Sequence, residues 1–147
     1  MTAIHIKFPA LTLKAGPRAM ARIRAQGLNA ADVGTLPGAA GGPKALGIQG
    51  LDLALFGEWL PSAPRERSLI GASVGSWRFA SACLPDAAEG IRRLGELYAE
   101  QNFNKGVTMA EISQSSQRML NDLLDGRDAS ILDNAHYRLN IMVVKSQ

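Results

Sequence analysis

The sequence contains very little cysteine and few aromatic residues. Cys83 is the one cysteine among 147 residues, so the chain holds no internal disulfide and no cysteine-based zinc cluster. A reducing, cytoplasmic setting is therefore expected. Aromatic residues make up 5% of the chain, and no basic stretch is interleaved with them, which argues against nucleic-acid binding.

Long hydrophobic runs are also missing. No stretch reaches the roughly 18 apolar residues that a membrane-spanning helix requires. Lys7, Pro9 and Lys14 interrupt the N-terminal apolar residues, so we identify no secretory signal. The chain is nevertheless 46% hydrophobic and 20% charged. This composition excludes disorder, collagen and coiled coil, and it predicts a single domain over residues 1–147 with a core of its own.

The net charge of +3 comes from the N-terminal part of the chain. A basic segment of this kind is usually the solvated face of a helix, and contact with anionic lipid is the alternative. Within residues 1–32, the basic residues outnumber the single acidic one; they are Lys7, Lys14, Arg18, Arg22 and Arg24, against Asp32.

Hydrophobic periodicity predicts strands that alternate with helices. Extended segments are expected at residues 4–14 (broken at Pro9), 33–36, 69–70 and 137–145. Helices are expected from Pro17 to the stop at Gly27, over 46–60, over 76–84, after an N-cap at Asp86, and after a capping box at Thr108. The helix over 46–60 is apolar nearly all round, so it should be buried. The alternation predicts an α/β fold with a mainly parallel sheet.

A serine lies between the predicted strand at 69–70 and the helix that follows. The segment Gly71-Ala72-Ser73-Val74-Gly75 fits G-x-S-x-G, and its strand-to-helix setting is the one that a nucleophile elbow requires. The turn would expose the Ser73 hydroxyl at a helix N-terminus, where the N–H of Val74 and the helix dipole favour developing negative charge. The plainer alternative is a tight turn with a capping serine.

A glycine-rich turn lies before the helix at 46–60. Gly41 and Gly42 can direct their N–H groups outward, and Lys44 can hold a phosphate or carboxylate. A phosphate-binding P-loop is rejected, because that motif needs glycine at Pro43 and a hydroxyl residue at Ala45. The turn therefore predicts donors for a tetrahedral oxyanion, and a turn without a ligand is the alternative.

These two motifs together resemble the patatin-like phospholipases. Gly42 and Ser73 lie 31 residues apart, and the resemblance covers about residues 33–84. It implies a three-layer α/β/α fold with a mainly parallel sheet, and a Ser–Asp dyad that cleaves lipid esters without histidine. Ser73 matches the nucleophile, Gly41 and Gly42 match the oxyanion glycines, and Lys44 matches the basic residue of that loop.

The base that a serine nucleophile needs is not evident in the sequence. The resemblance implies an aspartate in an Asp-Gly-Gly or Asp-Gly-Ala turn, and the one Asp-Gly here, Asp125-Gly126, closes a strongly patterned helix. Asp133 and His136 follow Ser73 in the order of α/β-hydrolase triads, but no strands separate them to bring them to the elbow. We therefore expect that residues 1–147 are the N-terminal part of a longer hydrolase, with the fold incomplete in this chain and the aspartate beyond residue 147.

The function expected from the sequence is a serine acyl hydrolase for lipid esters, including phospholipid at a membrane surface. No metal or organic cofactor is indicated. Because the base is missing, hydrolysis by residues 1–147 alone is in doubt. The alternative is a catalytically inactive, truncated patatin-like module that retains the acyl pocket and binds or interacts. Nucleotide binding at the glycine-rich turn is a weaker rival.

Overall fold

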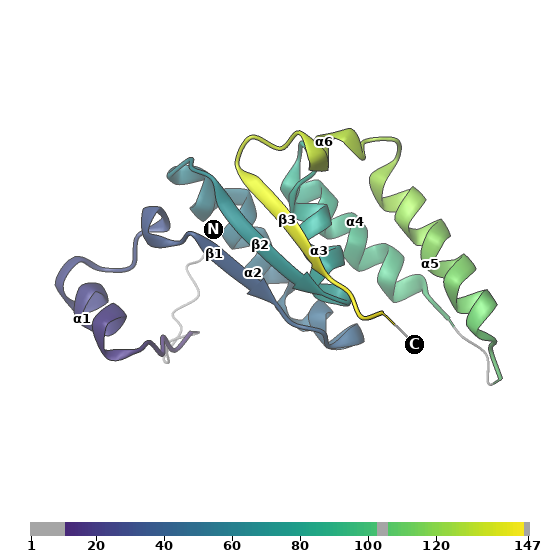
Figure 1. Cartoon of the computed structure of the whole chain (residues 1–147), viewed down its shortest axis with the longest axis horizontal. Coiled ribbons are helices and arrows are strands. Elements are labelled where there is room, and N and C mark those ends of the chain that lie inside the picture. The colour runs from purple at the N-terminus through teal and green to yellow at the C-terminus, as the bar shows by residue number, and fades with distance from the viewer. Residues whose placement is uncertain (1–10, 103–105, 146–147) are drawn as a thin grey trace, which may run out of the picture.

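The computed structural model describes residues 11–102 and 106–145 and contains a three-stranded parallel sheet. The strands are β1 (Thr35–Gly38), β2 (Arg67–Ala72) and β3 (Tyr137–Met142), with β2 in the middle. Figure 1 shows the three arrows side by side and pointing the same way. The α/β prediction is confirmed, and the carboxyl ends of all three strands lie at one edge of the sheet.

The helices that local sequence signals predicted are present. Asp86 caps α4 by accepting a hydrogen bond from the Glu89 N–H, and Thr108 forms the capping box of α5 with Glu111. The α-helices are α1 (Pro17–Gln26), α2 (Gln49–Ala54), α3 (Val74–Ala82), α4 (Ala87–Glu100), α5 (Met109–Leu124) and α6 (Ala129–Leu132).

The segment between β1 and β2 differs from the buried helix expected over residues 46–60. It is an irregular helix that passes from a 3-10 turn (Gly42–Ile48) through α2 to a π-helical turn (Leu55–Trp59). Ile48 is 41% exposed and Leu51 is 36% exposed, so the prediction of full burial was wrong. Part of the apolar surface of this irregular helix, including Ile48 and Leu51, therefore faces away from the core.

The bounds of all three strands also differ from the prediction. β1 begins and ends two residues later than the 33–36 segment, and β2 extends the short 69–70 segment in both directions. β3 ends at Met142 rather than at residue 145. The extended segment expected at 4–14 lies largely outside the described residues, and residues 11–14 are not in a strand.

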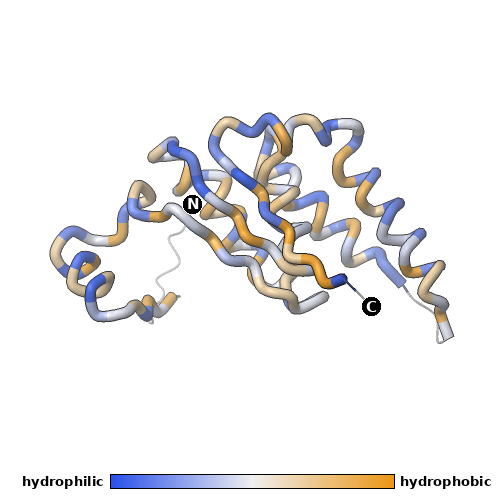
Figure 2. Tube along the Cα trace, in the orientation of Figure 1, coloured by the Kyte–Doolittle hydropathy of each residue, from blue (hydrophilic) through white to orange (hydrophobic). Residues whose placement is uncertain are grey.

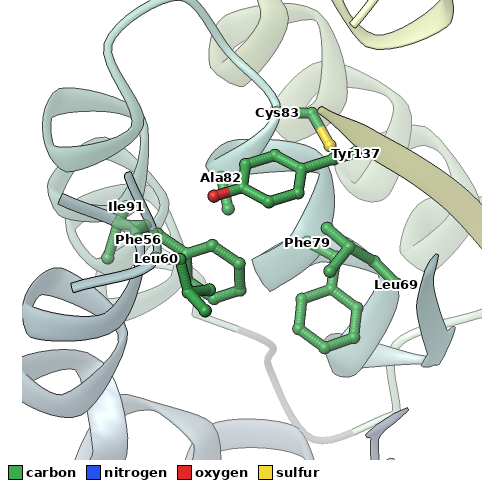
Figure 3. Close-up of a cluster of buried hydrophobic side chains, with 8 residues drawn as sticks. All are labelled: Phe56, Leu60, Leu69, Phe79, Ala82, Cys83, Ile91 and Tyr137. Atoms are coloured by element: carbon green, nitrogen blue, oxygen red, sulfur yellow. The ribbon is translucent and has the colours of Figure 1, made fainter. Parts of the chain in front are cut away.

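The core lies between the sheet and the helices on one of its faces. Figure 1 shows α2 and α3 behind the sheet and α4 next to α3, whereas α1 lies apart from them without a buried residue. The Phe56 ring meets the rings of Phe79 and Tyr137 edge to face, with centroids 5.9 and 5.7 Å apart. Figure 3 shows this cluster of buried side chains, which comprises Phe56, Leu60, Leu69, Phe79, Ala82, Cys83, Ile91 and Tyr137.

The opposite face of the sheet is open in the part of the chain that the structure describes. On β2, Leu69 points into the core and is fully buried, whereas the next residue, Ile70, is 37% exposed. The described helices therefore supply one layer beside the sheet, and the third layer of the expected arrangement is not among them. Within residues 11–102 and 106–145, no helix combines the length and hydropathy that crossing a bilayer demands.

Candidate active site

Ser73 occupies a sharp turn between β2 and α3. Its backbone has φ 52° and ψ −125°, a conformation that side chains rarely adopt. Such a backbone costs about 1–3 kcal/mol and persists only where its surroundings enforce it. The side chain is exposed. The strand–turn–helix setting predicted for Ser73 is therefore present, with the strain that is characteristic of a nucleophile elbow.

The two glycines of the motif are required by backbone packing. A Cβ atom on Gly71 would lie 2.6 Å from the backbone N and Cα of Ser76, inside the turn. A Cβ atom on Gly75 would lie 2.1 Å from the carbonyl oxygen of Gly38, at the end of β1. Backbone packing therefore requires glycine at both of these positions around Ser73. A serine that only capped a helix would not require either glycine.

Ser73 also lies where amide groups are available. Val74 is the first residue of α3, and the amides of a first helical turn have no acceptor within their own helix. The Ser76 N–H donates to the Ser73 carbonyl at 2.8 Å, which closes the turn and leaves the Ser73 hydroxyl outside it. An oxyanion near this hydroxyl would meet the positive end of the α3 dipole.

The glycine-rich turn leaves the sheet at the same edge as Ser73. In the parallel pairing of β1 and β2, Gly38 lies opposite Gly71, so the two turns start from neighbouring strand ends. Because a Cβ atom on Gly75 has no room beside the Gly38 carbonyl, the first turn of α3 packs closely against the end of β1. Gly42 has φ 54°, a left-handed conformation that favours glycine.

The polar groups of this turn face solvent. Gly41 and Lys44 are exposed, and the Lys44 N–H donates to the Gly41 carbonyl at 3.4 Å. Sequence and topology thus bring the glycine-rich turn and the serine turn to one edge of the sheet.

A cavity of about 310 Å³ opens beside Ser73. Gly41, Gly42, Lys44 and Val74 do not line it. This cavity was not predicted from the sequence, although Trp77 and Ala80 follow Ser73 at helical spacing and could have indicated a shared helix face. The lining consists of Ser73, Ser76, Trp77 and Ala80 with residues from α5 and β3, namely Leu120, Ile141 and Met142.

No aspartate, glutamate or histidine lines this cavity. His136 lies at the other edge of the sheet, because its carbonyl accepts from the N–H of Arg67, where β2 begins. The six residues of β2 separate that edge from Ser73 by about 20 Å at the usual rise per residue. Asp133 precedes His136 at the end of α6. The structure therefore excludes a Ser73–Asp133–His136 triad.

Asp125 is a helix terminus, as the sequence predicted. It caps α5 in a left-handed conformation with φ 49°, and its carboxylate lies 3.7 Å from Arg93 and 4.0 Å from Arg127. These two guanidinium groups form ion pairs with the carboxylate. Asp125 therefore has a structural role at this end of α5.

Cys83 carries a thiol, which is a second kind of candidate nucleophile. Its side chain is 1% exposed, and burial raises the pKa of its thiol to about 12. A thiol that stays protonated in the core cannot attack a substrate. Among the described residues, Ser73 is thus the candidate nucleophile that combines exposure with a strained backbone.

Comparisons with known proteins identify no relative: no protein-family model, no curated protein and no solved structure matches this chain.

Proposed function

We propose that this chain carries the nucleophile of a serine acyl hydrolase that acts on lipid esters, with the architecture of the patatin-like phospholipases. The single observation that carries the proposal is the Ser73 turn, with its positive φ and two glycines that backbone packing requires. Strain of this kind is retained where the exposed hydroxyl has a use. The three-layer form of the fold belongs to this proposal.

In the proposed mechanism, the Ser73 oxygen attacks the ester carbonyl and forms a tetrahedral intermediate. The hydroxyl proton passes to a base and then to the departing alkoxide, so an alcohol leaves and an acyl-enzyme remains. Water then cleaves the acyl–serine ester and releases the acid. The N–H groups of Gly41, Gly42 and Val74 would stabilise the oxyanion, and losing one such donor typically costs about 3 kcal/mol.

The base is proposed to be an aspartate outside residues 1–147. The cavity beside Ser73 has no acidic or histidine residue in its lining, so none of its lining residues can act as the base. Residual attack by Ser73 without its base depends on the oxyanion donors alone, so we expect slow reaction of this chain.

Lys44 is proposed to bind the phosphate of a phospholipid head group. It lies in the exposed part of the glycine-rich turn, within three residues of Gly41. An exposed ammonium group suits a charged group that stays in water while the acyl part enters the protein.

Contact with a membrane surface is part of the same proposal. Val143 and Val144, which follow β3 next to the cavity residues Ile141 and Met142, are 82% and 97% exposed. Figure 2 shows this hydrophobic end of the trace close to the C-terminus. Apolar side chains at the cavity mouth suit a substrate that is delivered from a lipid surface.

A fluorophosphonate probe tests the proposed activity, because it reacts with activated serines and remains attached. We expect slow labelling of the wild-type chain that disappears in Ser73→Ala and persists in Ser62→Ala. Ser62 is the control, since it is also an exposed serine but lies outside the cavity, where its hydroxyl donates to the Trp59 carbonyl. Labelling that survives Ser73→Ala, or no labelling of the wild type after prolonged incubation, would overturn the proposal.

The second candidate function is a catalytically inactive module that binds lipid. The cavity without an acid or base favours it. This candidate predicts ligand binding without labelling of Ser73, so the same probe separates the two functions.

A further inference from the structure

The cavity beside Ser73 has the shape and chemistry of a site for one hydrocarbon chain. We infer that it holds the single acyl chain of the substrate, with Trp77 forming its wall and Ala80 setting its depth. The inference rests on the proposed function, because it places the chain next to the hydroxyl that would attack its carbonyl.

The depth of the site follows from the geometry of α3. Trp77 and Ala80 lie four and seven residues after Ser73, so all three share one helix face. Seven residues of helix rise about 10 Å. The cavity therefore runs along about two turns of α3, from the exposed hydroxyl to the small side chain of Ala80. A larger side chain at that position would shorten it.

The chemistry of the lining changes along this path. The Ser73 and Ser76 hydroxyls lie at the first turn of α3, whereas the rest of the lining is apolar. The Ser76 oxygen is buried and has no hydrogen-bond partner among the described residues. An ester presents its polar atoms at one end and its hydrocarbon at the other, which matches this order. The side walls come from Leu120, Ile141 and Met142.

The volume of the cavity suits one hydrocarbon chain better than two. Its volume of about 310 Å³ lies at the lower end of the range of about 300–1,000 Å³ for ligand pockets. A second acyl chain would have to lie outside, over the exposed residues that follow β3. The substrate class is therefore an ester whose short or medium acyl chain enters alone.

Tryptophan fluorescence tests this inference without requiring catalysis. The chain has two tryptophans, and the Trp59→Phe variant leaves Trp77 as the only emitter. We would titrate it with octanoate, decanoate and palmitate that carry bromine at the chain end, since bromine quenches a tryptophan that it contacts. We expect saturable quenching, with brominated octanoate or decanoate binding more tightly than palmitate. The matched variant Trp77→Phe, which retains Trp59, should show no saturable quenching.

Two further variants in the Trp59→Phe background test the depth. Ala80→Phe should weaken binding of brominated decanoate about tenfold or more, and Leu120→Ala should shift the preference towards palmitate. Circular dichroism verifies that each variant is folded. Quenching that never saturates, or equal affinity in folded Ala80→Phe and Leu120→Ala, would overturn the inference. Quenching of the Trp59→Phe parent does not require Ser73 to react, so saturable quenching without fluorophosphonate labelling would overturn the proposed chemistry and leave the acyl site standing.

Discussion

At the scale of single residues, Ser73 combines an exposed hydroxyl with a backbone that destabilises the fold. Its φ of 52° with ψ −125° suits glycine and strains any residue with a Cβ atom. The same residue is exposed at the end of β2. Stability and the proposed activity thus make opposite demands on this position.

The first prediction concerns this trade-off. Ser73→Gly relieves the strain, whereas Ser73→Ala keeps it, so the glycine variant should be about 1 kcal/mol more stable than the alanine variant. Both variants should lose fluorophosphonate labelling. Urea unfolding measures the difference, and an alanine variant as stable as the glycine variant would contradict the claim of strain.

The second prediction compares two glycines that both lie in helices. Gly75→Ala forces a Cβ atom to within 2.1 Å of the Gly38 carbonyl oxygen, where both partners are backbone, so it should destabilise the protein by about 3 kcal/mol. Gly50→Ala meets nothing within 4 Å and should stabilise α2 by about 0.5–1 kcal/mol. Thermal unfolding of the two variants measures both effects, and shifts of the same sign would refute the packing argument.

The third prediction concerns the pH dependence of Cys83. Burial raises the pKa of its thiol from 9.0 to about 12. The folded chain keeps the proton while the unfolded chain releases it above pH 9.0, so the contribution of Cys83 to stability is complete below that pH and falls as the pH rises towards 12.

Two measurements test this pH dependence. Native protein at neutral pH should resist thiol reagents that react at once in urea. Cys83→Ala should remove part of the alkaline loss of stability, and Tyr137, whose pKa burial also raises, accounts for a further part. A native thiol that reacts as fast as the unfolded one would contradict the prediction.

At the scale of secondary-structure elements, a buried ion pair joins the helix of the glycine-rich turn to the helix of the nucleophile. Asp52 on α2 accepts from Nε and Nη2 of Arg78 on α3, each at 2.6 Å. The Asp52 side chain is 3% exposed and that of Arg78 is 15% exposed. The pair therefore fixes the position of α2 against α3.

The fourth prediction follows from the burial of this pair. Asp52→Ala leaves the guanidinium group of Arg78 without its counter-ion and should destabilise the protein by about 3 kcal/mol. The double variant Asp52→Leu with Arg78→Met should recover most of that loss, because an apolar pair removes the stranded charge. Denaturant unfolding of the single and double variants provides the test, and a double variant no more stable than Asp52→Ala would argue against it.

The elements that the sequence predicted well have local causes. Pro17, Asp86 and Thr108 satisfy or avoid the unpaired amides of a first helical turn, and this chemistry needs no tertiary contact. The segment 42–62 was predicted poorly, because packing against α3 and α4 determines its path.

The burial of Arg67 also could not be predicted from its residue type. A charged side chain is expected on the surface, yet Arg67 is 2% exposed. Three carbonyl oxygens explain its burial, since its guanidinium donates to those of Val33, Ala30 and Ala63 at 2.8–3.0 Å.

The candidate site likewise has one part that the sequence predicts and one part that it does not. The turn around Ser73 is encoded within five consecutive residues, so its form could be predicted from them. The cavity beside it could not, because Leu120 and Met142 come from α5 and β3, far along the chain. Only the fold brings these side chains to Ser73, and the position of His136 at the opposite edge likewise depends on the direction of β3.

At the scale of the whole molecule, the described part of the chain leaves apolar surface exposed beside β3. β3 pairs with β2 on one side, and its other side has no strand partner among residues 11–102 and 106–145. An unpaired edge with apolar neighbours promotes association between chains.

The fifth prediction is that residues 1–147 self-associate with rising concentration. Val143→Lys with Val144→Lys should reduce this association, because charges at an edge oppose pairing. Size-exclusion chromatography with light scattering measures the mass of both forms. Arg18→Ala with Arg22→Ala on the exposed helix α1 provides a control that should leave the association unchanged. A wild-type chain that stays monomeric at every concentration would contradict the prediction.

The order in which the strands pair has a consequence for how the protein acquires its site. β1 and β2 pair residues 33 positions apart (Thr35 with Ser68), whereas β2 and β3 pair residues 70 positions apart (Arg67 with Tyr137). Contacts between distant residues close larger loops and form more slowly. During synthesis, the serine turn can therefore be complete before the ribosome has released β3, so the Ser73 turn forms first and the cavity beside it is completed last.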